Sequence, residues 1–508
     1  MGLSEARAAQ RSISESEYVQ LDAVALAALV RRRELSASEL LEVAIARAER
    51  LNPGLNAIVI PMYELARARA RSALTGPLAG VPFLLKDLFQ DYAGVLATSG
   101  CRALRRAGAT PPRHSEIVER HLAAGLVVFG RTNTPELGAK GVTEPEAWGP
   151  TRNPWSLDRS PGGSSGGAAV AVAAGIVPMA GASDGGGSIR IPAASTGLFG
   201  LKPGRGRTPS GPGVGEVMHG AAMNHVITRS VRDSACMLDA TCAPERGAPC
   251  RLAPPERAYA EEVGRDPGRL RVAFSTRSPL GTEVDPAAVA AVEQTARLLE
   301  GLGHRVEPAD PAIDGKALAR DFTRMWFAQL AHQVSTIRAQ TRASARDFEL
   351  DTLAMEAIAR ARSAPEYVAS YVHFCEYGYQ LSAFLGGYDV YMTPTLAAPA
   401  PAIGGVSTPQ WASALVRASM PLGLARLIPL FAGTIEQVTL ANLRGVPFTQ
   451  LANVTGVPAM TVPLHAFPDG LPLGIHFLAD HGGEGRLLAL AGQLEQVAPW
   501  HERRPSID

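Results

Sequence analysis

Lys86 has the surroundings of a lysine that can act as a base. It follows the apolar run 80–85, and a buried ammonium group without a partner is costly unless it loses its proton. Lysine can lose that proton inside a protein, whereas arginine cannot. A neutral amine can then take a proton from a serine hydroxyl, directly or through a second hydroxyl. The alternative is an ion pair between Lys86 and the adjacent Asp87 at the end of a strand.

Two glycine-rich segments each hold a serine that such a base could activate. Ser164 lies in the segment 161–167, where glycines allow backbone conformations that other residues avoid. Ser188 follows the glycines at 185–187, whose consecutive N–H groups could stabilise the negative oxygen of a tetrahedral intermediate. Taken alone, the first segment is also compatible with a linker or a phosphate-binding loop, and the second with a tight turn.

Histidine and metal chemistry have weaker support in the sequence. His219 and His225 follow the glycine-rich segments and could line a site, but neither stands in a nucleophile motif, and no G-x-S-x-G sequence occurs. No H-E-x-x-H motif or Cys/His cluster indicates a metal site. We therefore expect neither a metal nor a cofactor.

The composition is typical of a globular enzyme. Of 508 residues, 46% are hydrophobic and 19% are charged, and the net charge of +1 gives no electrostatic reason to bind nucleic acid or an anionic membrane. Residues 1–18 contain no apolar segment of a secretion signal, and the small-residue stretch 166–182 is interrupted by glycine and proline. The five cysteines are too few for a disulfide framework. These features predict a cytoplasmic protein that acts on a small molecule, with no nucleic-acid or membrane partner.

The spacing of apolar residues predicts an α/β arrangement around these segments. Helical spacing between 21 and 50 indicates two helices, of which the second begins at the capping box 36–39 and stops at 52–54. From 77 to 207, short apolar runs alternate with glycine-rich turns, which is typical of strands that feed helices. A surface connection is expected at 251–268. The remaining predicted elements are strands at 270–274 and 388–394, helices within 286–301 and 313–379, a hairpin of strands 459–464 and 473–478, and a final helix at 485–496.

Taken together, the segments resemble the amidase signature family. Its hallmarks are a Gly-Gly-Ser-Ser-Gly-Gly loop, an Asp-x-Gly-Gly-Ser-Ile-Arg element and an upstream lysine in a Gly-Val-Pro-x-x-x-Lys-Asp context, and this chain contains all three. The resemblance extends to 130–133, 200–203 and 456–459. It implies an α/β fold, with a mixed central β-sheet surrounded by α-helices, in a single amidase domain over 1–508. The parts would be N-terminal helices at 1–75, the signature core with the catalytic residues at 76–235, a helical substrate region at 286–440, and C-terminal strands and a helix at 441–508.

The resemblance also implies a role for each candidate residue. Ser188 would be the nucleophile, Lys86 the general base, and Ser164 the serine that bridges them and follows a cis peptide bond. The oxyanion-hole amides would be those of Gly185, Gly186, Gly187 and Ser188. No cofactor is implied. The chain departs from many relatives at Gly185 and Ala168, which leaves its substrate more open than its reaction type.

The segment 142–155 is most similar to the subgroup that contains the 6-aminohexanoate cyclic dimer hydrolases and related bacterial amidases. This similarity favours hydrophobic, aryl, or cyclic or oligomeric amides as substrates, although the segment could equally serve only to frame the loop of Ser164. Trp326, Phe327 and Ser165 are the candidate substrate-binding residues, and the apolar segment 422–431 could form a further wall. The alternative for the residues after position 320 is that they belong to ordinary buried helices.

Three other functions are compatible with the sequence. The same three residues could cleave carbamates or esters. The chain could also be the A-type subunit of a glutamyl-tRNA amidotransferase, which needs partner subunits, but its near-zero charge offers no nucleic-acid surface. A non-catalytic binding protein on the same fold is the third alternative, and the intact lysine and serines argue against it. Association into a homodimer is left open.

Overall fold

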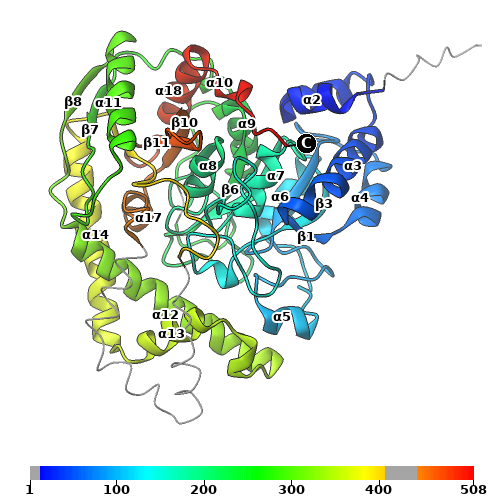
Figure 1. The fold of residues 1–508 in the computed structure, drawn as a ribbon, viewed down its shortest axis with the longest axis horizontal. Coiled ribbons are helices and arrows are strands. Elements are labelled where there is room, and N and C mark those ends of the chain that lie inside the picture. The colour runs from blue at the N-terminus through cyan, green and yellow to red at the C-terminus, as the bar shows by residue number, and fades with distance from the viewer. Residues whose placement is uncertain (1–11, 244, 251, 407–442, 508) are drawn as a thin grey trace, which may run out of the picture.

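The computed structural model describes residues 12–243, 245–250, 252–406 and 443–507. Helices surround its strands (Figure 1). The strands are β1 Ile58–Pro61, β2 Pro82–Lys86, β3 Val127–Thr132, β4 Met179–Asp184, β5 Phe199–Lys202, β6 Met223–Thr228, β7 Arg271–Phe274, β8 Arg305–Pro308, β9 Val390–Pro394, β10 Ala459–Ala466 and β11 Pro472–Leu478.

In the described residues these strands form a three-stranded sheet, ordered β1-β3-β2, and an eight-stranded sheet, ordered β4-β6-β5-β10-β11-β9-β7-β8. Both sheets are mixed. In the first, β3 pairs parallel with β2 and antiparallel with β1. In the second, β7 pairs parallel with β8 and β9, and β10 pairs antiparallel with β5 and β11. The predicted α/β class with a mixed sheet is confirmed.

The helices form a larger share of the described chain than the strands. Those of the described residues are α1 Glu15–Gln20, α2 Ala23–Arg31, α3 Ala37–Leu55, α4 Tyr63–Ala70, α5 Arg102–Ala107, α6 Glu116–Ala123, α7 Gly166–Ala173, α8 Arg190–Thr196, α9 Val231–Thr241, α10 Tyr259–Glu262, α11 Pro286–Gly301, α12 Gly315–Thr341, α13 Leu350–Arg360, α14 Ala364–Leu385, α17 Gln450–Thr455 and α18 Glu484–Val497. The C-terminal hairpin of β10 and β11 and the helix α18 that follows it confirm the sequence-based prediction.

The helix α3 begins as predicted but ends later. Ser36 caps it, and the reciprocal bonds with Glu39 form the predicted capping box. The prediction that 52–54 stops the helix was wrong, because α3 runs through Pro53 to Leu55. Proline removes only one N–H from the last turn, and Asn56, in the left-handed region with φ 51°, donates its N–H to Asn52 O at 2.7 Å and so completes the turn.

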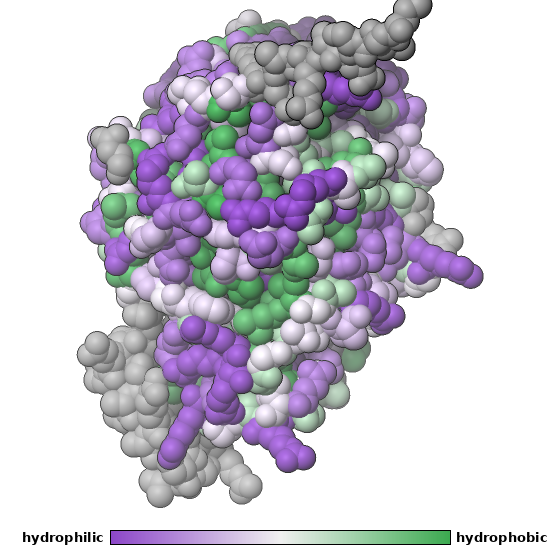
Figure 2. All heavy atoms as spheres, turned by 90° about the vertical axis from the view of Figure 1, so that its right-hand side faces the viewer, coloured by the Kyte–Doolittle hydropathy of each residue, from purple (hydrophilic) through white to green (hydrophobic). Residues whose placement is uncertain are grey.

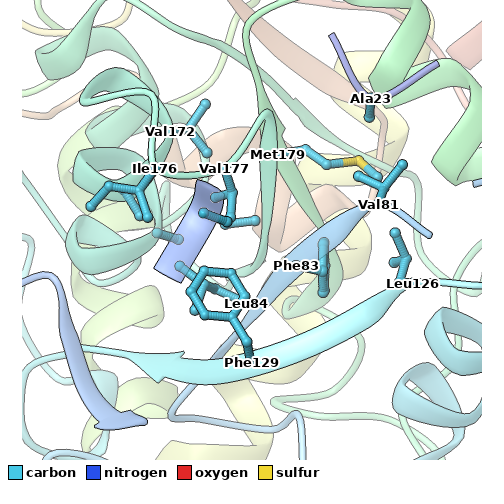
Figure 3. Close-up of a cluster of buried hydrophobic side chains, with 14 of the residues drawn as sticks. Ala23, Val81, Phe83, Leu84, Leu126, Phe129, Val172, Ile176, Val177 and Met179 are labelled. Atoms are coloured by element: carbon cyan, nitrogen blue, oxygen red, sulfur yellow. The ribbon is translucent and has the colours of Figure 1, made fainter. Parts of the chain in front are cut away.

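An apolar core lies where β2, β3 and α7 meet (Figure 3). Phe83 of β2, Phe129 of β3 and Val172 of α7 are all fully buried there. A second contact joins β2 to β4 at its carboxyl end, where Gln90 accepts the N–H of Lys86 at 2.9 Å and donates to Ala182 O at 3.2 Å. The end of β2 is therefore held against the end of β4.

Three helices of the middle region, α12, α13 and α14, lie together on one side of the sheets, at the lower left of Figure 1. Phe322 and Met325 of α12 form an apolar cluster with Phe374 and Tyr377 of α14 and Val454 of α17. These contacts bring α12 next to the C-terminal part of the chain. The segment 422–431, expected from the sequence to form a wall, and the last part of the predicted helical region 286–440 lie outside the described residues.

The surface carries no uniform apolar face on the side of the N-terminal helices. Figure 2 shows hydrophilic and hydrophobic side chains intermixed on that side, with the hydrophobic ones gathered near its middle. Among the helices that the structure describes, none is long and apolar enough to cross a membrane.

Candidate active site

Lys86 is the last residue of β2, and its side chain is fully buried. Burial lowers the pKa of Lys86 to about 7, although the nearby charge of Asp184 acts in the opposite direction. Its Nζ lies 2.8 Å from Ser164 Oγ and 3.0 Å from Ser183 Oγ. The predicted alternative, an ion pair with Asp87, does not form, because Asp87 pairs with Arg131 at 2.9 Å. Lys86 is thus a buried amine between two serine hydroxyls, and it titrates near neutrality.

Ser164 precedes α7 and follows a cis peptide bond from Gly163, as the resemblance implied. The glycines of this loop are needed because its backbone passes close to other elements. A Cβ on Gly166 would lie 2.3 Å from Thr143 Oγ1, which accepts the Gly166 N–H and donates to Gly162 O at 2.9 Å. Thr143 therefore holds the loop on both sides of Ser164.

Ser165 joins this loop to the neighbouring strand. Its hydroxyl donates to Ser183 O at 3.2 Å and accepts the Ser183 N–H at 3.3 Å. Its own N–H donates to Ser188 O at 3.3 Å, so the two serine loops are in contact. The hydroxyl proposed from the sequence to bind substrate is thus occupied in fixing the loop to β4.

Ser188 stands in the turn between β4 and α8 and is 7% exposed. Its hydroxyl has no hydrogen-bond partner among the residues that the structure describes. The backbone N–H groups of Gly185, Gly186 and Ser188 likewise have no acceptor there. The N–H of Gly187 differs from them, because it donates to Asp184 Oδ1 at 2.7 Å. Gly187 also has φ 127°, a conformation that favours glycine.

Asp184 and Arg190 form a buried ion pair that fixes this turn. Two bonds join their side chains, Arg190 Nε to Asp184 Oδ2 at 2.9 Å and Arg190 Nη2 to Asp184 Oδ1 at 3.0 Å. Burial alone would raise the pKa of Asp184, but the charge and hydrogen bonds of Arg190 hold it well below its usual range. The C-terminal part of the chain completes the network, since Asn453 Nδ2 donates to Asp184 Oδ1 at 2.9 Å and Arg190 donates to Thr449 O at 2.9 Å.

Ser183, Asn453 and Thr449 are contacts of the site that the sequence reasoning missed. Ser183 directly precedes the motif 184–190, and this position is the one feature of the sequence that could have indicated its place in the site. Asn453 and Thr449 lie more than 250 residues after Arg190 in the chain, and no local sequence pattern identifies them.

Large side chains border the turn 185–188, which we call the glycine turn. A Cβ on Gly185 would lie 3.1 Å from Trp326 Cζ3 and 3.2 Å from Met218 Sδ, and a Cβ on Gly186 would lie 2.7 Å from Phe322 Cζ. Glycine at 185 thus leaves room for Trp326. Phe322 and Trp326 are four residues apart on α12 and share one face, with ring centroids 5.4 Å apart.

Of the two aromatic residues proposed from the sequence as substrate contacts, the structure brings only Trp326 to the glycine turn. Phe327 is the next residue on α12 and points about 100° away around the helix. Phe322, which was not among the proposed residues, takes the position beside Gly186.

The two candidate histidines differ in burial and in hydrogen-bond partner. His225 is fully buried, its Nε2 lies 2.8 Å from Ser234 Oγ, and burial lowers its pKa to about 3. His219 lies next to Met218 and contacts Tyr367 of α14. In the part of the chain that the structure describes, no group of three His, Cys, Asp or Glu residues is arranged to hold a metal ion.

The chain is similar to known proteins over nearly its whole length. The sequence model of the Amidase family matches residues 39–488. The chain is 36% identical over 493 residues to the 6-aminohexanoate-cyclic-dimer hydrolase of Pseudomonas sp. (strain NK87), covering 96% of each chain. A solved structure of 6-aminohexanoate cyclic dimer hydrolase matches with a TM-score of 0.86 and 35% identity, covering 96% of this chain and 99% of that one. A bacterial aryl acylamidase of the amidase signature family matches with a TM-score of 0.81 and 26% identity, covering 97% and 98%.

Proposed function

Because this chain belongs to the amidase family and is a hydrolase of carbon–nitrogen bonds, we propose that it cleaves carboxamides through Ser188, Ser164 and Lys86. The observation that carries the proposal is the 2.8 Å contact between Lys86 Nζ and Ser164 Oγ at a fully buried position. A lysine whose pKa is about 7 is partly neutral at physiological pH and can accept a proton. The backbone contact between Ser165 and Ser188 keeps the second serine loop beside the first.

In the proposed reaction, the Ser188 hydroxyl, which has no partner among the described residues, turns toward Ser164. Neutral Lys86 takes the hydroxyl proton of Ser164 while Ser164 takes that of Ser188. Ser188 Oγ bonds to the amide carbon, and the carbonyl oxygen takes up the electron pair. The intermediate then collapses, the C–N bond breaks, and the proton returns through Ser164 to the leaving amine. A water molecule activated by the same residues hydrolyses the acyl ester, so that the carboxylic acid leaves and Ser188 regains its proton.

The glycine turn would supply the donors for the oxyanion. Of the four predicted amides, those of Gly185, Gly186 and Ser188 are free of acceptors within the described residues, which suits them to this role. The Gly187 N–H is already bonded to Asp184, so we assign it first to holding the shape of the turn. The ion pair of Asp184 with Arg190 keeps the donors in place without reorganisation during the reaction.

We further propose that the acyl side of the substrate is hydrophobic. Trp326, Phe322 and Met218 border the glycine turn and offer apolar surface beside the reacting carbonyl. The names of the similar proteins agree with this class, since one hydrolyses a cyclic dimer of 6-aminohexanoate and another is an aryl acylamidase. The same three residues could also cleave carbamates or esters, in which the attacked carbonyl is equivalent.

Trapping the acyl group tests the nucleophile. After brief mixing with an activated aryl ester and acid quenching, the protein is cleaved before Asp184, which separates Ser188 from Ser164 and Ser165, and mass spectrometry should find the acyl mass on the peptide that contains Ser188. Peptides that contain Ser164 and Ser165 provide the internal control and should stay unmodified. An acyl group on Ser164 instead would transfer the nucleophile to the first loop and overturn the assignment.

The pH dependence of kcat/KM tests the base. Lys86 must be neutral to accept a proton, so kcat/KM should rise with pH and level off above a midpoint near its pKa of about 7. Burial also lowers the pKa of Lys202 to about 7, but its Nζ donates to Pro203 O at 2.8 Å and touches neither serine. The variant Lys202→Met should therefore keep the rising limb. A flat profile from pH 5 to 9, or loss of the limb in Lys202→Met, contradicts the role of Lys86.

A further inference from the structure

Three polar residues meet beyond the apolar wall of the glycine turn. They come from different elements: His219 from the turn 217–220, Gln329 from α12 and Tyr367 from α14. The Tyr367 hydroxyl bonds to His219 Nε2 and accepts from Gln329 Nε2 at 3.1 Å. The imidazole also packs on Tyr371, with ring centroids 4.9 Å apart. Each of the three bonded residues is only partly buried, so the cluster is accessible from solvent.

The hydrogen bonds of the cluster favour one tautomer of the neutral His219 ring. Because Gln329 donates to the Tyr367 oxygen, His219 Nε2 is the one acceptor that the described residues offer to the Tyr367 proton. Burial lowers the pKa of His219, which favours the neutral imidazole. A neutral ring that accepts at Nε2 has its proton on Nδ1. This Nδ1–H has no acceptor among the residues that the structure describes.

The backbone of the turn shows that the position of His219 is specifically held. Met218 and His219 both lie in the left-handed region, with φ 55° and 53°, and Gly220 follows with φ 73°. Such conformations are uncommon for residues with a side chain and persist where the surroundings impose them. Met218, the neighbour of His219, is the residue whose sulfur lies against Gly185 of the proposed oxyanion turn.

The helix α12 connects the cluster to the reacting centre. Phe322, Trp326 and Gln329 are spaced four and three residues apart, so they lie along one face of the helix. The first two border Gly186 and Gly185, and the third holds Tyr367. Gln329 lies about 4.5 Å along the helix axis from Trp326 and about 10 Å from Phe322. This face therefore changes from apolar beside the glycine turn to polar one to two helical turns away.

We propose that His219 determines specificity, donating its Nδ1–H to an oxygen on the acyl chain of the substrate, beyond the apolar stretch that Trp326 and Phe322 border. The substrate class is then an amide whose acyl chain has an apolar stretch followed by a second carbonyl group. Tyr367 and Gln329 act as positioning residues, because they set the tautomer and the orientation of the imidazole. The inference rests on the proposed function and makes it more specific.

Two chromogenic substrates separate this role from general packing. The 4-nitroanilide of 6-acetamidohexanoic acid carries a second carbonyl at a suitable distance, and the 4-nitroanilide of nonanoic acid has the same chain length without it. Wild-type enzyme should hydrolyse the first with the higher kcat/KM. In His219→Gly, which suits the left-handed backbone, this preference should fall about tenfold, the effect of one lost hydrogen bond.

Two further variants test the positioning. Tyr367→Phe keeps the imidazole but removes the group that fixes its tautomer, so the preference should fall about threefold. Tyr371→Phe is the matched control, because its ring also packs on His219 while its hydroxyl has no partner among the described residues, and its preference should equal that of wild type.

An equal loss on both anilides in His219→Gly would show a packing role only and would overturn the proposal. Hydrolysis of neither anilide by wild-type enzyme would overturn the proposed function itself, and this proposal with it.

Discussion

The variant Ser188→Ala should lose hydrolysis by a factor on the order of 10⁴ or more while remaining folded. Alanine has no group that can form the acyl ester, and the remaining rate would come from the oxyanion donors and substrate binding alone. The fold should not suffer, because the Ser188 hydroxyl has no hydrogen bond to any residue that the structure describes, so its removal breaks none. Steady-state hydrolysis and the midpoint of thermal unfolding, measured on the same preparation, check both parts.

A serine in the neighbouring helix provides the control for this variant. Ser195 is buried in α8, and among the described residues its hydroxyl bonds only to Ile191 O of its own helix, at 2.9 Å. Ser195→Ala should therefore keep its turnover within a few-fold of wild type. Turnover in Ser188→Ala above one per cent of wild type, after contaminating enzyme is excluded, would show that the nucleophile is another residue.

The variant Lys86→Met should lower kcat/KM by about 10² to 10⁴, the contribution expected of a positioned general base. Methionine keeps the apolar stem that fits the buried end of β2 but cannot accept a proton. Lys86→Arg should also be inactive, because the guanidinium stays charged in a protein. The arginine variant is a less secure test of catalysis alone, since a permanent charge at this fully buried position also destabilises the fold.

Lys202→Met is the matched control, because Lys202 is the other fully buried lysine whose pKa burial lowers to about 7. Its turnover should stay within about tenfold of wild type. Equal losses in the two methionine variants would assign the effect to the burial of a lysine rather than to proton transfer. Normal unfolding midpoints are required in both variants for the comparison to count.

Local patterns were enough to predict much of this protein. The strand that ends at Lys86, the glycine loops of Ser164 and Ser188, and the C-terminal hairpin each depend on neighbouring residues, whose periodicity and turn chemistry are visible in the sequence. The family also follows from these motifs, because their order and spacing along the chain are specific.

Contacts between distant segments were decided only by the tertiary structure. The partnership of Lys86 with Ser183 depends on the packing of β2 against β4, and the Asp184 network depends on Asn453 from the C-terminal part. The selection of Phe322 rather than Phe327 follows from the rotation of α12 about its axis, which packing against the glycine turn fixes. Such long-range choices leave no local pattern in the chain, because each depends on which surfaces fold against one another.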